Sequence, residues 1–136
     1  MICGNPHFPV SLRLFGFDDR IEVPIGLRIS GRSVRLLAKV DTGASFCIFN
    51  RGYAEQLGLE VESGIHQVVS TVTGEFDVYG HELTLSCLDW EFPTTVYFAA
   101  MPEYRRNVVG RSGWLQQFKL GLVDHDGALF LSQYDD

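Results

Sequence analysis

The sequence predicts an all-β protein, and three observations carry that prediction. Short strand-like runs recur at close intervals along the chain. Each run is bounded by Gly, Pro, Asn or Asp, which are residues that commonly form turns. Only two short segments have a helical pattern. Because 136 residues suffice for one core but not for two ordinary domains, we expect a single domain, residues 1–136, built as a β barrel or sandwich.

The expected elements follow in chain order. Strands are predicted at Ser11–Phe15, Ile21–Ile29, Ser33–Val40, Ile65–Val72, Phe76–Tyr79, Glu82–Leu88, Thr94–Ala99 and Leu129–Ser132. A helix is predicted at Arg51–Leu57, because Asn50 before it is a good N-cap residue and Gly58 ends the pattern. A second helix is predicted at Arg111–Phe118, where apolar side chains fall on one face.

The charge balance narrows the class of partner. The chain carries 11 basic and 17 acidic residues, a net charge of −6, which argues against nucleic acid or an anionic membrane as the main partner. A peptide or another protein is the expected partner. The N-terminal residues lack a signal-peptide pattern, and Cys3, Cys47 and Cys87 form no C-x-x-C pair. We therefore expect a cytoplasmic protein with free thiols, no metal and no cofactor.

The most informative motif is the triplet Asp41-Thr42-Gly43. It follows an apolar run, so Asp41 is expected where a buried strand leaves the core, and Gly43 is expected to allow a sharp turn there. The alternative interpretation is an ordinary strand-end turn, since Asp, Thr and Gly are all turn residues. The triplet alone does not decide between the two.

The context of the triplet adds a family resemblance. D-T-G-A-S is followed by apolar residues, and a second element, Asn107-Val108-Val109-Gly110-Arg111, comes late in the chain. In these motifs, from about Ile21 to Val123, the sequence resembles the retropepsin-like aspartic proteases. The resemblance implies a closed β barrel with a flap hairpin, acting as a homodimer. It also implies that Thr42 bonds across the dimer axis, that Gly43 lets substrate backbone come close, and that Ala44 completes the site.

Aspartic protease chemistry explains why a single triplet suffices. Peptide hydrolysis by this class needs two carboxylates that share one proton, so that one accepts a proton from water and the other polarises the scissile carbonyl. The chain contains no second D-T-G or D-S-G, since Asp126-Gly127 lacks the middle hydroxyl. The resemblance therefore implies a dyad made by Asp41 of two copies related by a twofold axis.

The flap is expected at Val68–Val78, with alternating arms around Thr73-Gly74-Glu75. Such a hairpin can close over an extended peptide, and we expect Val72, Thr73 and Gly74 to contact it. The alternative is a hairpin without a moving part, because turns rich in Gly are common in β proteins.

Pocket residues are expected on both sides of the triplet. Lys39 should point to the same face of its strand as Asp41, and Arg106 directly precedes the late motif. Ile48 and Val108 are the expected apolar walls. The two cations suggest a substrate with an acidic or polar side chain near the cut; alternatively, both extend into solvent.

One residue departs from the family pattern. Ser45 stands where the family often has an acidic partner for Arg111, which leaves the role of Arg111 open.

The sequence thus predicts an aspartic endopeptidase that cleaves extended peptide or protein segments. Its main rival is a non-catalytic module of the same fold that serves in dimerisation or peptide binding, because fold does not dictate function. A third interpretation is a plain barrel in which D-T-G occurs by chance.

Overall fold

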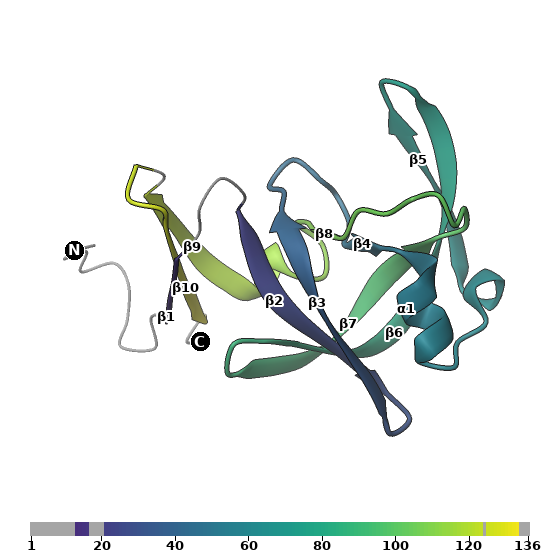
Figure 1. Cartoon of the computed structure of the whole chain (residues 1–136), viewed down its shortest axis with the longest axis horizontal. Coiled ribbons are helices and arrows are strands. Elements are labelled where there is room, and N and C mark those ends of the chain that lie inside the picture. Colours follow the sequence, from purple (N-terminus) through teal and green to yellow (C-terminus); the bar gives the residue numbers. More distant parts are fainter. Residues whose placement is uncertain (1–12, 17–20, 124, 134–136) are drawn as a thin grey trace.

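The computed structural model describes residues 13–16, 21–123 and 125–133. Figure 1 shows a mostly β chain, and the described residues form one α-helix. The strands are β1 (Arg13–Gly16), β2 (Glu22–Ile29), β3 (Arg32–Val40), β4 (Ile48–Phe49), β5 (Ile65–Thr71), β6 (Gly74–Cys87), β7 (Trp90–Ala99), β8 (Val108–Val109), β9 (Phe118–Val123) and β10 (Ala128–Gln133). The helices are α1 (Arg51–Gln56) and the 3₁₀ turns η1 (Val61–Ser63) and η2 (Leu115–Gln117). The prediction of an all-β architecture with few helices is confirmed.

The larger sheet has the strand order β2-β3-β8-β4-β7-β6-β5. An additional antiparallel pairing, Leu27 with Leu85, joins β2 to β6 and closes the strands from β2 to β6 in this order into a ring, with β5 outside it. The short strand β8 lies between β3, to which it is parallel, and β4, to which it is antiparallel. The chain therefore returns late in the sequence to the place where β3 ends. This insertion positions the candidate site.

Strict alternation builds the core inside the ring. Along β2 and β3 every second residue is buried, which places Val23, Ile25 and Leu27 opposite Val34, Leu36 and Ala38. The largest fully buried side chains include Trp114, Phe49 and Phe98. The neighbouring residues of each strand face outward.

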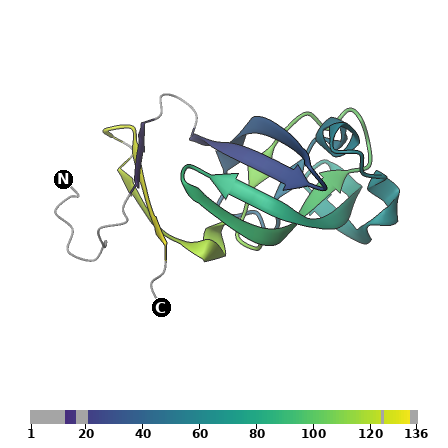
Figure 2. The same ribbon diagram turned by 90° about the horizontal axis from the view of Figure 1, so that it is seen from below.

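The smaller sheet has the order β1-β10-β9 and lies at one side of the molecule, as Figure 2 shows from below. Leu129 and Leu131 of β10 are fully buried and belong to the main core cluster, together with Phe118 at the start of β9. The small sheet is therefore packed onto the ring by its apolar side chains.

The first predicted helix is confirmed and the second is wrong. Asn50 caps α1 by accepting the Gly52 N–H at 2.7 Å, and Gly58 follows the helix with φ of +79°. From Arg111 onward the chain instead makes turns and the 3₁₀ turn η2, because Gly113 has φ of +99°, which interrupts a right-handed helix. Phe118 then begins β9, a strand that was not predicted.

Strand boundaries also differ from the prediction. The predicted runs Phe76–Tyr79 and Glu82–Leu88 belong to one continuous strand, β6, which passes through Gly80 and ends at Cys87, so that Leu88 lies in the following turn. Gly80 is not a break: a Cβ there would lie 2.8 Å from the ring of Tyr97, so glycine leaves room for that ring. Within the first predicted strand, Ser11 and Leu12 lie outside the described residues, as does Cys3. In the part of the chain that the structure describes, none of the helices has the length and apolar character to cross a membrane.

Candidate active site

The loop that carries Asp41 begins where β3 ends at Val40. The Asp41 N–H donates to the Val109 carbonyl at 3.0 Å, which continues the pairing of β3 with β8. The Ala44 N–H donates to the Asp41 carbonyl at 3.1 Å, and the Gly43 N–H donates to Asp41 Oδ1 at 3.0 Å. The carboxylate is therefore held by the backbone of its own turn, a geometry that Asp commonly adopts.

The triplet faces outward from the ring. The Asp41 side chain is half-buried, whereas Thr42 and Gly43 are exposed. Among the described residues, the Thr42 hydroxyl has no hydrogen-bond partner. The chain does turn at Thr42-Gly43, as expected, and the Ala44 N–H closes this turn. Gly43 does not take a left-handed backbone conformation, and a Cβ there would meet Asp41 Oδ1 at 3.4 Å.

The late motif, residues 107–111, packs closely against the backbone of the Asp41 loop. A Cβ at Gly110 would lie 2.4 Å from the Phe46 carbonyl oxygen and 2.6 Å from that of Ala44, so only glycine allows this approach. Beyond it, the Arg111 N–H donates to the Ala44 carbonyl at 2.9 Å. Since Gly110 follows β8 directly, the same short segment pairs with β3 and supports the loop that leaves it.

Asn107 and Asn50 connect the late motif to α1 by hydrogen bonds. Asn107 accepts the Lys39 N–H at its carbonyl at 2.8 Å and the Asn50 N–H at its Oδ1 at 3.0 Å. The Asn50 amide group in turn donates to the carbonyl of Tyr104. The N-cap of α1 therefore also holds the segment 100–107 that leads into β8.

Beside the Asp41 loop, one face of the sheet combines a cation with two apolar side chains. Lys39 and Val108 are register partners, and Val108 pairs in turn with Ile48, so the three side chains share a face. Ile48 and Val108 are 6% and 7% exposed, yet neither belongs to the main core cluster. The next residue along each strand, Phe49 and Val109, does belong to that cluster. They cover the outer face, on the side of Asp41.

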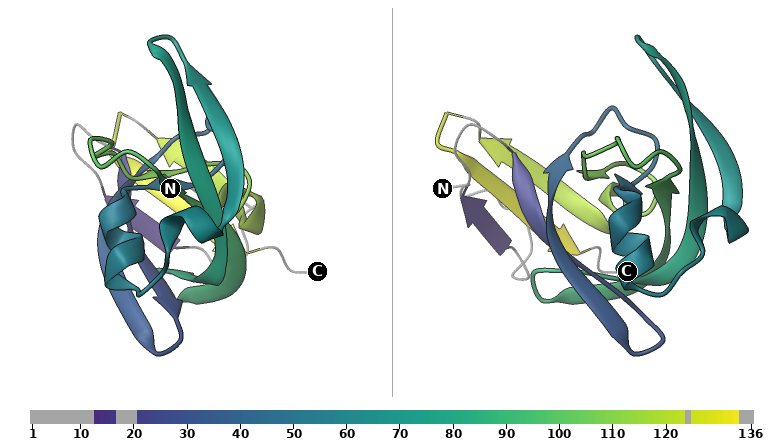
Figure 3. Two further views of the ribbon diagram at one scale, coloured as in Figure 1. Left: turned by 90° about the vertical axis from the view of Figure 1, so that its right-hand side faces the viewer. Right: turned by 45° about the vertical axis from the view of Figure 1, so that its right-hand side comes forward.

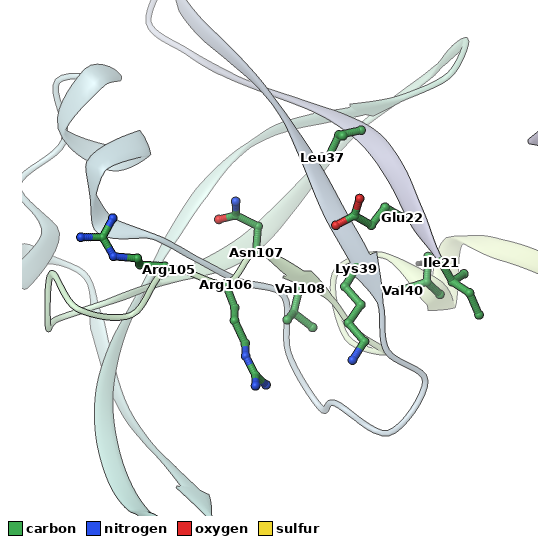
Figure 4. Close-up of a pocket in the computed structure, with 9 residues that line it drawn as sticks. All are labelled: Ile21, Glu22, Leu37, Lys39, Val40, Arg105, Arg106, Asn107 and Val108. Carbon is green, nitrogen blue, oxygen red and sulfur yellow. The ribbon is translucent and has the colours of Figure 1, made fainter. Parts of the chain in front are cut away.

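A cavity of about 550 Å³ opens on this face. It is lined by Ile21, Glu22, Leu37, Lys39, Val40, Arg105, Arg106, Asn107 and Val108. Figure 4 shows Lys39 and Arg106 pointing the same way on either side of Val108, whereas Arg105 points away from them. The structure thus brings together Lys39, Arg106 and Val108, while Ile48 does not line this cavity.

Tyr104 links the cavity electrostatically to Asp41. Burial is the largest influence and raises the pKa of the Tyr104 hydroxyl; the positive charge of Arg106 opposes this rise, and the negative charge of Asp41 adds to it. One half-buried phenol therefore lies within electrostatic reach of both Asp41 and Arg106.

The predicted hairpin is formed by β5 and β6, which pair from Ile65 with Gly80 to Thr71 with Gly74. Its turn is Val72-Thr73, slightly earlier than expected, and Gly74 has φ of +136°, which favours glycine. The hairpin projects from the rest of the chain in Figures 1 and 3, and the Val72 side chain is fully exposed. Val72, Thr73 and Gly74 therefore lie at its tip and do not line the cavity.

Arg111 makes no ion pair within the described part of the chain, and Ser45 is exposed. The contribution of Arg111 to the site comes from its backbone N–H. Sequence reasoning missed Glu22, Asn50 and Tyr104 as parts of this region. Glu22 is the cross-strand partner of Lys39, but a register is not readable from either strand alone, and Tyr104 lies in a segment without periodicity.

Comparisons with known proteins agree with this arrangement. The sequence profile of the family described as aspartyl protease matches residues 25–112. No curated protein matches the chain. Among solved structures, a retropepsin-like aspartic protease from Rickettsia conorii is similar with a TM-score of 0.65 at 18% identity, covering 90% of this chain and 100% of that chain. The EIAV protease complexed with the inhibitor HBY-793 is similar with a TM-score of 0.53 at 16% identity, covering 71% of this chain and 86% of that chain. At these identities the likeness concerns the fold, which is retropepsin-like.

Proposed function

The chain belongs to the aspartyl protease family, and we propose that it is an aspartic endopeptidase that hydrolyses peptide bonds in extended segments. The observation that carries the proposal is the Asp41 loop, which hydrogen bonds and close backbone packing hold in place. Its carboxylate is oriented by the Gly43 N–H at 3.0 Å, and its backbone is supported by the β8 segment that ends at Gly110. Catalytic groups work best when their geometry is set before substrate binds.

The proposed dyad consists of Asp41 from two copies of the chain. One chain supplies a single D-T-G, and the exposure of Thr42 and Gly43 supports a surface available to a second copy. In a twofold dimer the same patch meets itself, so the two Asp41 loops are neighbours. Thr42, whose hydroxyl has no partner within the described residues, is proposed to bond across the axis.

Two adjacent carboxylates divide the acid and base roles. Two like charges held close together do not both ionise, so the pair shares one proton. The ionised member takes a proton from water, whose oxygen then bonds to the scissile carbonyl carbon; the protonated member donates to the carbonyl oxygen. The carboxyl that took the water proton then protonates the scissile nitrogen, while the other carboxylate takes a proton from one hydroxyl of the tetrahedral intermediate. The C–N bond breaks, the carboxyl and amine products leave, and the pair is back in its starting protonation state.

The hairpin of β5 and β6 is proposed to cover the bound peptide. Its tip at Val72-Thr73 projects clear of the ring, as Figure 3 shows, and its exposed position supports contact with a strand-like substrate. Lid closure of this kind excludes water from the reacting groups.

The test is peptide hydrolysis by the wild-type chain and by Asp41→Asn, with a diverse peptide mixture and mass spectrometry of the products. Asp126→Asn is the matched control, because Asp126 directly precedes a glycine, lies outside the D-T-G triplet and is in the turn between β9 and β10. The expected result is cleavage by the wild type and the control, and none by Asp41→Asn. Cleavage retained in Asp41→Asn would refute the dyad.

A dimer requirement gives the second test. Activity per chain should fall on dilution in step with dissociation measured by analytical ultracentrifugation, because each chain brings half of the dyad. A fully active monomer would exclude the shared dyad even if peptides are cleaved.

A further inference from the structure

The cavity beside Asp41 has an excess of positive charge. Its lining includes three cations, Lys39, Arg105 and Arg106, against one carboxylate, Glu22. Within the described residues none of these four side chains makes an ion pair. The three cations are exposed to solvent, and their excess over the single carboxylate gives the cavity a positive surface that favours an anionic group.

Two of the three cations, Lys39 and Arg106, point in the same direction. In Figure 4 Lys39 and Arg106 flank Val108 on one side, the Lys39 ammonium points away from Glu22, and Arg105 is turned aside. Val108 is 7% exposed and forms an apolar floor between the two charges. An apolar surface with a cation at each edge is complementary to a side chain that has a short aliphatic part and ends in a carboxylate.

This part of the cavity is next to the proposed chemistry. Lys39 precedes Asp41 by two residues, and Val109, whose carbonyl accepts the Asp41 N–H, directly follows Val108. The charges of Arg106 and Asp41 both reach the Tyr104 hydroxyl. A side chain seated on Val108 would therefore belong to a substrate residue close to the bond being cut.

From these observations we propose that the cavity selects an Asp or Glu side chain of the substrate, so that the enzyme cleaves proteins beside acidic residues. The inference rests on the proposed endopeptidase function. Arg106 would hold the carboxylate with its planar guanidinium and Lys39 with a point charge, over an apolar contact with Val108. In a dimer the cavity occurs twice, which places acidic preference on both sides of the cut.

The overall charge of the chain makes this selection specific. The chain is acidic, with a net charge of −6, so its long-range field repels anionic segments. A basic cavity in an acidic chain therefore acts at close range, on a side chain that has already entered the cleft.

The test compares matched peptides. The mass-spectrometry products define a cleaved sequence, and peptides are then made with Glu, Gln or Leu at each position adjacent to the cut. We expect kcat/KM to be about tenfold or more higher for Glu than for its neutral isostere Gln at one or more positions. In the double variant Lys39→Met and Arg106→Met this ratio should fall to near one.

Arg35→Met is the matched control, since Arg35 is an exposed cation on the same strand as Lys39 and does not line the cavity. Its Glu-to-Gln ratio should equal that of the wild type. The ratio is internal to each variant, so a partial loss of folded protein leaves it unchanged, and the wild-type ratio needs no variant at all.

The outcomes separate the two proposals. Cleavage with equal rates for Glu and Gln, or with a ratio that survives the double variant, overturns the acidic cavity and leaves the endopeptidase standing. A wild-type chain that cleaves no peptide in the mixture overturns both.

Discussion

The ring of Tyr104 stacks on the ring of Phe76, with centroids 5.2 Å apart and planes inclined by 27°. Phe76 belongs to the β6 arm of the projecting hairpin, whereas Tyr104 belongs to the segment that leads into β8. The Ala100 N–H, at the start of that segment, also donates to the Asp77 carbonyl at 2.9 Å. The hairpin is therefore attached to the same segment that supplies Arg106 to the cavity.

This stack should restrain the hairpin. Aromatic pairs contribute about 0.5–1.5 kcal/mol beyond the area they bury, so Tyr104→Leu should lower amide-exchange protection in residues 68–78 by about twofold to tenfold. Tyr104→Phe keeps the ring and should preserve protection. Equal losses in both variants would mean that the hydroxyl, and not the stacked ring, restrains the hairpin.

Gly110 and Gly43 should respond differently to a methyl group. At Gly110 the new Cβ would lie 2.4 Å from the Phe46 carbonyl oxygen, so Gly110→Ala should cost roughly 1–3 kcal/mol of unfolding free energy through overpacking. At Gly43 the nearest atom is 3.4 Å away and the backbone is not left-handed, so Gly43→Ala should fold with little loss. Urea unfolding of both variants makes the comparison, and a Gly43→Ala chain as unstable as Gly110→Ala would contradict it.

The two described cysteines should be inert in the folded protein. Burial raises the pKa of Cys47 from 9.0 to about 12 and that of Cys87 from 9.0 to about 11. Because the thiolate is the reactive form, a disulfide reagent at pH 8 should label neither until the chain unfolds. The experiment uses a Cys3→Ala background, and rapid labelling of the native chain would contradict the burial of these thiols.

Alkaline pH should weaken the fold through the same thiols. A raised folded-state pKa means that the stabilising contribution is fully present below pH 9 and is lost as pH rises toward 12 for Cys47. Unfolding free energy measured from pH 8 upward should therefore decline less steeply in Cys47→Ala than in the wild type. Parallel declines would assign the loss to other groups.

An ion pair at α1 should add an acid-sensitive contribution. Arg51 binds Glu62 at 2.8 Å, and this hydrogen bond is the main reason that the pKa of Glu62 is lowered from 4.5. A lowered pKa means stability that is present above pH 4.5 and lost as pH falls below it. Glu62→Gln should flatten the fall of unfolding free energy as pH drops below 4.5, whereas Glu103→Gln, an exposed acid without an ion pair in the described chain, should leave it unchanged.

The buried pattern of β2 and β3 was predictable from the sequence because a strand alternates its faces with a period of two. Asn50 as the N-cap of α1 was predictable for an equally local reason, since its side chain bonds to an N–H two residues away. The late helix was predicted wrongly because the apolar spacing of Trp114, Leu115 and Phe118 fits a helix. The left-handed conformation of Gly113 and the pairing of β9 with β10 override that local pattern.

We could predict from the sequence that the protein is mostly β, that Asp41 follows a buried strand, and that Lys39 and Val108 lie near it. The first two, and the place of Lys39, follow from local patterns and short spacings, whereas the place of Val108 follows from the family resemblance. Three features came from the folded structure: β8 inserts between β3 and β4, Glu22 pairs with Lys39, and Tyr104 lies between the hairpin and the cavity. Strand register and loop placement depend on contacts between residues far apart in the chain, and each such contact is chosen by the packing of the whole core.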